Sequence, residues 1–125
     1  YRHYEQVDIA LDSFPYNGTT TTCEAIWMGV PVLTWIGVGQ RARTAASLLT
    51  HAGLEDWIAH TEEEWTQIAA KWVSNPNELN ALRHGLRQQA EASTIGDGEA
   101  FGHKFYGTVR KLLESAFRPD SKNAS

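Results

Sequence analysis

The fold is decided by residues 7–35, which read VDIALDSFPYNGTTTTCEAIWMGVPVLTW. Residues 7–12 alternate branched apolar side chains with small or acidic ones, the period-two pattern of a strand that is buried on at least one side. Pro15 and the pair Asn17-Gly18 then favour a change of chain direction. A short helix beginning in the threonine run and a second strand over residues 30–35 complete the segment. This order predicts a βαβ unit with parallel strands and a right-handed crossover.

The rest of the chain adds mainly helices to this unit. The elements that follow are recognised by their periodicity and their flanking turn residues: a helix over 41–51, a short strand over 54–59, and amphipathic helices beginning near Thr61, Asn75 and Phe101. We therefore expect an α/β fold, partial and Rossmann-like, with a short parallel sheet and a helical carboxyl-terminal half. A polar tail follows over residues 118–125.

Composition limits the classes of function. The 125 residues, 42% of them hydrophobic, suffice for one packed domain. A formal net charge of -4 and the lack of a basic block argue against binding to a nucleic-acid backbone. The single cysteine, Cys23, excludes an internal disulfide, and no apolar run approaches the roughly 20 residues of a membrane span. These features predict a cytoplasmic protein with no membrane contact.

Four consecutive threonines, Thr19 to Thr22, stand where a helix begins after a strand. In an open parallel sheet, ligands collect beyond the carboxyl ends of the strands, and a helix N-terminus there offers free N–H groups to a phosphate. Threonine hydroxyls would add donors. The alternative is that the run simply caps its own helix, and the pattern alone gives the two interpretations about equal weight.

Three charged residues near this turn are further candidates. Glu24, one turn into the same helix, is placed to accept hydrogen bonds from ribose hydroxyls, although spacing alone favours a solvated acid at the positive end of a helix dipole. Arg41 and Arg43 are candidates for contacts with a diphosphate, and the alternative is that they are ordinary surface cations.

Metal and thiol chemistry find little support. The five histidines never fall at metal-ligand spacing with one another or with Cys23, so we expect no metal site. Cys23 lies near a helix N-terminus, where a lowered thiol pKa is conceivable. With no histidine at a suggestive spacing, a small buried side chain is the favoured interpretation. The five tryptophans mostly occupy periodic apolar positions and are expected in the core.

Residues 8–32, DIALDSFPYNGTTTTCEAIWMGVPV, resemble the nucleotide-sugar-binding core of the O-GlcNAc transferase and SPINDLY family of glycosyltransferases. The resemblance continues through residues 43–49 and more loosely to Leu113. It implies that residues 1–117 are the carboxyl-terminal part of the second lobe of a GT-B catalytic region, in a parent that carries tetratricopeptide repeats.

The resemblance implies a role for several residues. Thr20 and Thr21 match the paired threonines that hold the diphosphate of a UDP-sugar, and Glu24 matches the acidic residue that binds the ribose. Gly18 matches the glycine that lets the backbone approach the phosphates. His3 stands where the animal enzymes have an arginine beside the uracil, which implies a base contact.

The same resemblance implies what the parent does. It would transfer a sugar from the nucleotide donor to Ser or Thr hydroxyls of a protein acceptor, with inversion and without a metal or other cofactor. The resemblance implies that the phosphate-binding lysine of the family lies upstream of Tyr1 and that its candidate catalytic histidine belongs to the other lobe. We therefore expect no catalytic residue in this chain, and no transfer by the chain alone.

Two other functions remain open from the sequence. One is a nucleotide-binding or protein-interaction module that kept the fold without transfer activity, and the other is an unrelated α/β nucleotide enzyme. Three candidate strands are also fewer than the roughly six of a complete Rossmann-like lobe. An uncovered sheet edge and unpaired helix faces are therefore expected to favour a homodimer or a domain swap.

Overall fold

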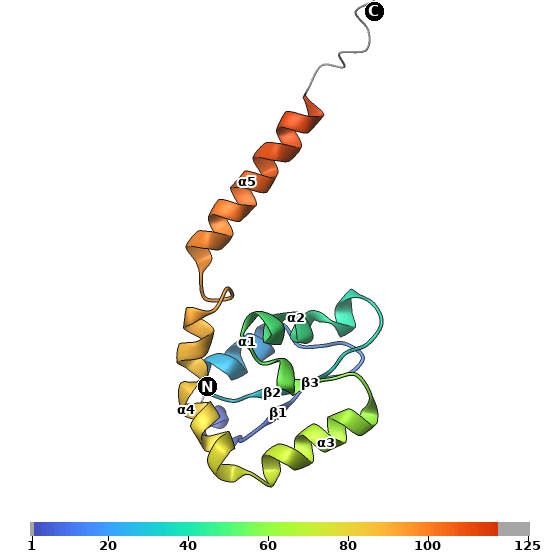
Figure 1. The fold of residues 1–125 in the computed structure, drawn as a ribbon, viewed down its shortest axis with the longest axis vertical. Coiled ribbons are helices and arrows are strands. Elements are labelled where there is room, and N and C mark those ends of the chain that lie inside the picture. Colours follow the sequence, from blue (N-terminus) through green and yellow to red (C-terminus); the bar gives the residue numbers. More distant parts are fainter. Residues whose placement is uncertain (1, 118–125) are drawn as a thin grey trace, which may run out of the picture.

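The computed structural model describes residues 2–117; residue 1 and the predicted polar tail, 118–125, lie outside the described residues. The elements follow the predicted order, with short 3₁₀ turns added (Figure 1). They are η1 (Arg2–Gln6), β1 (Ala10–Leu11), α1 (Thr20–Trp27), β2 (Val32–Trp35), η2 (Gln40–Ala42), α2 (Thr44–His51), η3 (Glu55–Trp57), β3 (Ile58–Ala59), α3 (Glu62–Val73), α4 (Pro76–Ala92) and α5 (Gly98–Ala116).

The sheet has three strands in the order β1-β2-β3, and both neighbouring pairs are parallel. Ala10 pairs with Val32 in the first ladder, and Thr34 pairs with Ile58 in the second. The carboxyl ends of the three strands therefore meet at one edge of the sheet. The predicted α/β fold with a short parallel sheet is confirmed.

The strand predicted over residues 7–12 is paired only at Ala10–Leu11. On its amino-terminal side the ladder stops because Pro31, the next residue of the opposite chain that faces β1, has no N–H to donate. The third strand is also shorter than predicted, because η3 takes up residues 55–57 before β3 begins.

Helices cover both sides of this sheet, with α2 and α3 on opposite sides in Figure 1. α1 and α2 contact β2, whereas α3 contacts β2 and β3. The core between these layers is made of large side chains that are at most 1% exposed, among them Ile26, Leu33, Leu49, Trp57 and Leu86. Burial of such side chains is the main source of stability for a domain of this size.

The tryptophans divide between the core and the surface. Trp57 is fully buried and stacks on Trp72 with the ring centroids 4.7 Å apart, as expected for core aromatics. Trp27 is 43% exposed, so its assignment to the core was wrong. Its ring lies under the Arg87 guanidinium, 4.2 Å from the ring centroid, and this cation–π contact covers one face.

The last helix, α5, forms as predicted but buries none of its side chains. Figure 1 shows it extending away from the sheet. Phe101 is 68% exposed and Leu112 is 62% exposed, although both lie on the apolar stripe that predicted the helix. Among residues 2–117, nothing covers this stripe.

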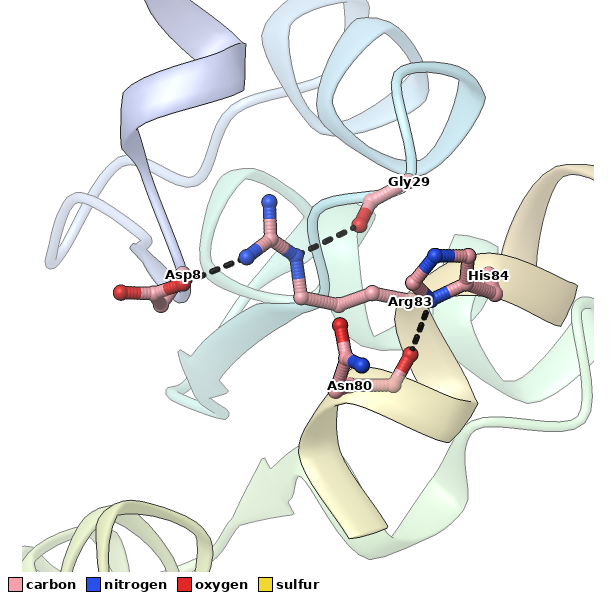
Figure 2. Close-up of polar contacts among 5 residues, drawn as sticks. All are labelled: Asp8, Gly29, Asn80, Arg83 and His84. Carbon is pink, nitrogen blue, oxygen red and sulfur yellow. Dashed lines mark hydrogen bonds and ion pairs between the residues drawn. The ribbon is translucent and has the colours of Figure 1, made fainter. Parts of the chain in front are cut away.

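A polar cluster fastens α4 to the turn between α1 and β2 (Figure 2). The Arg83 guanidinium donates to the Gly29 carbonyl at 3.3 Å and forms an ion pair with Asp8. Gly29 has φ +76°, and a Cβ there would lie 2.9 Å from the Arg83 carbonyl oxygen, so the close approach of the two segments requires glycine. This cluster holds the carboxyl-terminal end of α1, while the amino-terminal end faces the other edge of the sheet.

Candidate functional site: the threonine-rich turn

The turn between β1 and α1 is held by a carboxylate at the carboxyl end of β1. Asp12 Oδ1 accepts a hydrogen bond from the Gly18 N–H at 2.8 Å, and Asp12 Oδ2 accepts one from the Thr34 hydroxyl at 2.6 Å. The Asn17 N–H is donated to the Arg41 carbonyl at 2.8 Å. The turn is thus fixed to the strand edge and to the segment that precedes α2.

The amino-terminal end of α1 is not capped. Thr19 occupies the N-cap position with φ −121° and ψ −70°, and its side chain accepts no hydrogen bond from the first turn of the helix. The first turn also contains no acidic residue. Because the first N–H groups of an α-helix have no partner within the helix, this end presents donors and a positive dipole end.

The four threonines have different surroundings. Thr22 is 2% exposed and belongs to the buried side of the helix, whereas Thr20 and Thr21 are exposed. A Cβ on Gly18 would overlap Thr21 Oγ1 and lie 3.0 Å from Thr22 Oγ1. The turn therefore packs directly against these hydroxyls, and only glycine fits at position 18.

Glu24 is half-buried and lies on the same side of α1 as the exposed Thr20 and Thr21. It lies four residues after Thr20 and three after Thr21, a spacing that puts side chains on the same side of a helix. It also lines a groove of about 380 Å³ with Cys23, Trp27 and Met28. The structure thus brings Gly18, Thr20, Thr21 and Glu24 together at one end of one helix.

Two other predicted contacts lie elsewhere. His3 is exposed on η1, which leads into the amino end of β1, whereas the threonine-rich turn follows the carboxyl end. Arg43 stands at the start of α2, where its guanidinium donates to the Gly37 carbonyl at 3.4 Å. It lines a separate groove of about 460 Å³, together with Ser47, Glu55 and His60.

Comparison with known proteins decides the family. Residues 1–105 match the model of glycosyl transferase family 41. The chain belongs to this family. It is 42% identical to a probable UDP-N-acetylglucosamine--peptide N-acetylglucosaminyltransferase SPINDLY of Hordeum vulgare, in an alignment that covers 92% of the chain and 11% of the relative. It is 28% identical to the UDP-N-acetylglucosamine--peptide N-acetylglucosaminyltransferase of Caenorhabditis elegans, over 95% of the chain and 11% of that relative.

A solved O-GlcNAc transferase structure contains the same fold. A mutant of the O-GlcNAc transferase from Thermobaculum terrenum superposes with a TM-score of 0.84 at 36% identity, covering 92% of this chain and 22% of that chain. The chain therefore corresponds to about a fifth of the solved structure and about a tenth of the curated relatives. Membership of family 41 confirms the predicted resemblance and removes the unrelated α/β enzyme as an alternative.

The structure corrects the expectation for the thiol of this family 41 chain. Cys23 is exposed, not a buried core residue. Partial desolvation raises the pKa of the Cys23 thiol; a backbone hydrogen bond acts in the opposite direction, and the nearby negative charge of Glu24 adds a smaller increase. The pKa of this thiol is thus raised and not lowered, although Cys23 lies near a helix N-terminus.

Two residues of the turn escaped the sequence analysis. Asp12 ends the first strand, and its position at a strand's carboxyl end could have marked it as a site residue. Asn17 is 2% exposed and donates from Nδ2 to the Ser13 carbonyl at 3.1 Å. It was treated only as a turn residue.

Two kinds of feature are missing from residues 2–117. No group of three or more His, Cys, Asp or Glu residues there is placed to hold a metal ion. No helix in the same range is long and apolar enough to cross a membrane.

Proposed function

We propose that this chain supplies part of the nucleotide-sugar site of a family 41 protein O-glycosyltransferase. The observation that carries the proposal is the uncapped start of α1, where the exposed Thr20 and Thr21 and the half-buried Glu24 lie on one side of the helix, beyond the carboxyl end of β1. The uncapped helix start and the threonine hydroxyls fit the phosphates of a nucleotide, and a carboxylate one turn further along fits the hydroxyls of the adjoining sugar ring. The relatives' names support UDP-N-acetylglucosamine as the donor and a peptide or protein as the acceptor.

Each residue of the site has a proposed role. The hydroxyls of Thr20 and Thr21, with the first N–H groups of α1, donate to the diphosphate oxygens. The Glu24 carboxylate accepts hydrogen bonds from ribose hydroxyls. Gly18 lets the turn pack closely against Thr21. Contacts of His3 with the base and of Arg43 with the diphosphate remain proposals, supported by the exposure of both side chains.

The proposed chemistry is leaving-group stabilisation. The bond between the sugar C1 and the diphosphate oxygen breaks with its electron pair moving to the diphosphate. The acceptor hydroxyl oxygen bonds to C1 from the opposite side, and its proton passes to a base from another part of the protein. Negative charge grows on the diphosphate as the bond breaks, so fixed donors at the start of α1 stabilise the transition state more than the bound donor. Neither a metal nor another cofactor takes part in this scheme.

The test uses the complete protein that contains this chain. Incubation with UDP-N-acetylglucosamine and Ser/Thr peptides is expected to give glycosylated peptide by mass spectrometry, and Glu24→Ala should reduce its formation. Thr50→Val is the control for the threonine-rich turn, because Thr50 lies on α2, outside that turn, and its hydroxyl donates to the Ala46 carbonyl at 2.9 Å. Binding of UDP with no transfer would favour a non-catalytic nucleotide-binding module. No binding of UDP would contradict the proposed donor site and would favour a protein-interaction module.

We further propose that residues 1–125 alone do not transfer sugar to an acceptor and that they self-associate. We also propose a cytoplasmic location for the protein, because a single cysteine fits a reducing compartment. The exposed apolar stripe of α5 and the single pairing partner of β1 support self-association as a dimer or a domain swap. Sedimentation of the isolated chain should show dimers. A monomer at all concentrations, or sugar transfer by the isolated chain, would contradict these proposals.

A further inference from the structure

The Asp12 carboxylate is the most connected group of the threonine-rich turn. Asp12 Oδ1 accepts from the Ser13 N–H at 3.0 Å and from the Gly18 N–H at 2.8 Å. Asp12 Oδ2 accepts from the Thr34 hydroxyl at 2.6 Å. Both oxygens are therefore engaged within the protein.

These bonds join the buried sheet to the exposed turn. Thr34 lies on β2, the central strand, and is fully buried. Through Asp12 its hydroxyl fixes the Gly18 amide, and Gly18 in turn packs against the Thr21 hydroxyl. The position of the Thr21 hydroxyl thus depends on a chain of contacts that begins inside the sheet.

We propose that Asp12 is a positioning residue for the diphosphate part of the donor site, an inference that rests on the proposed function. Asp12 is not itself a phosphate ligand, because a carboxylate repels a diphosphate and both of its oxygens already accept hydrogen bonds. The Gly18 N–H is donated to Asp12 and not to the ligand. The donors left for the diphosphate are the hydroxyls of Thr20 and Thr21 and the first N–H groups of α1.

The geometry predicts different effects for two substitutions of Asp12. Asp12→Ala releases the Gly18 N–H and the Thr34 hydroxyl and should weaken UDP binding by about tenfold, the usual effect of losing well-placed hydrogen bonds. Asp12→Asn should bind UDP nearly as tightly as the unmodified protein. Its side-chain oxygen still accepts from Gly18, and its NH₂ group donates to the Thr34 oxygen.

The matched control is Asp8→Ala on the same segment. Asp8 pairs with Arg83 at the opposite end of β1, away from the turn. The Asp8→Ala variant should bind UDP as tightly as the unmodified protein, even if its melting temperature is lower. The experiment is calorimetric titration of UDP into the complete protein and the three variants. A Thr34→Val variant, with an expected loss of about threefold, gives a readout if Asp12→Ala does not fold.

The outcomes separate this inference from the function on which it rests. If the unmodified protein does not bind UDP, the proposed function is wrong. If it binds UDP and Asp12→Ala and Thr34→Val bind equally tightly, only the positioning role is wrong. Equal losses in Asp12→Ala and Asp12→Asn, or in Asp12→Ala and Asp8→Ala, would also overturn the role, because positioning by hydrogen bonds predicts that they differ.

Discussion

Two helices of this molecule begin after a threonine, and only one of these threonines caps its helix. Thr61 precedes α3 with an extended backbone, and its side chain accepts from the Glu64 N–H at 3.1 Å. The Glu64 carboxylate in turn accepts a hydrogen bond from the His60 N–H, at 2.7 Å, in the segment before the helix. Thr19 precedes α1 with ψ −70° and makes no such bond. The same residue type thus closes one helix and leaves the other open, depending on the backbone.

The two helix ends also differ in the number of acidic residues in the first turn. The first turn of α3 contains Glu62, Glu63 and Glu64, which offset the positive end of the helix dipole. The first turn of α1 contains no acidic residue. The closed, acidic end suits a structural helix, whereas the uncapped end, with no acidic residue in its first turn, suits an anionic ligand. This difference supports a donor site over a simple cap at the threonine run.

The largest expected effect comes from making α1 resemble α3. Thr20→Glu puts a carboxylate into the first turn of α1, removes one hydroxyl donor and adds repulsion toward a diphosphate. UDP affinity of the complete protein should fall by about a hundredfold or more, while the melting temperature stays equal or rises slightly. Calorimetry and thermal unfolding of the same sample measure both quantities. Unchanged UDP affinity would mean that the end of α1 is not a phosphate site.

The converse change removes the N-cap of α3. Thr61→Val removes the side-chain acceptor for the Glu64 N–H and should lower the free energy of unfolding by about 1 kcal/mol, the usual cost of a lost N-cap. UDP affinity should not change, because this helix end lies outside the proposed site. Urea unfolding followed by far-UV circular dichroism measures the effect. A loss of UDP binding with normal stability would break the distinction between the two ends.

The smallest expected effect is on the pH dependence of stability, through the Glu64 carboxyl group. The His60 N–H, by donating to the Glu64 carboxylate, lowers the pKa of Glu64. A carboxyl with a lowered pKa in the folded state stabilises the protein above its ordinary pKa, and this contribution disappears as pH falls through the folded value. Between pH 7 and pH 3, unfolding stability should therefore fall slightly less for Glu64→Gln than for the unmodified protein. Parallel pH profiles for the two proteins would contradict this assignment.

The local features of the fold were readable from the sequence, and the long-range ones were not. Residues 7–35 predicted the βαβ order because alternation, turn residues and helix signals are properties of neighbouring residues. The exact length of the first strand depended on its register against Pro31, which has no N–H to extend the ladder. The apolar stripe of α5 predicted a helix but could not show that its side chains lie uncovered.

The candidate site divides in the same way. Gly18, Thr20, Thr21 and Glu24 could be proposed from spacing and from the family resemblance, and the structure has Gly18 in the turn before α1 and the other three on α1 itself. Which threonine points inward depends on where the helix begins, and Thr22 is the buried one. The role of Asp12 depends on Thr34, 22 residues away, and no local pattern reveals that contact.

The central claim is that the threonine-rich turn binds the donor and is not merely a helix cap. Titrating UDP calorimetrically into the complete protein and into Thr21→Val, Glu24→Ala and Thr50→Val tests it most directly. Losing a hydrogen bond to a charged group costs roughly 1.5 to 3 kcal/mol, so Thr21→Val should bind UDP about ten- to a hundredfold more weakly. Glu24→Ala should also bind more weakly, and Thr50→Val should match the unmodified protein. If Thr21→Val and Glu24→Ala both bind UDP as tightly as the unmodified protein, the claim is contradicted.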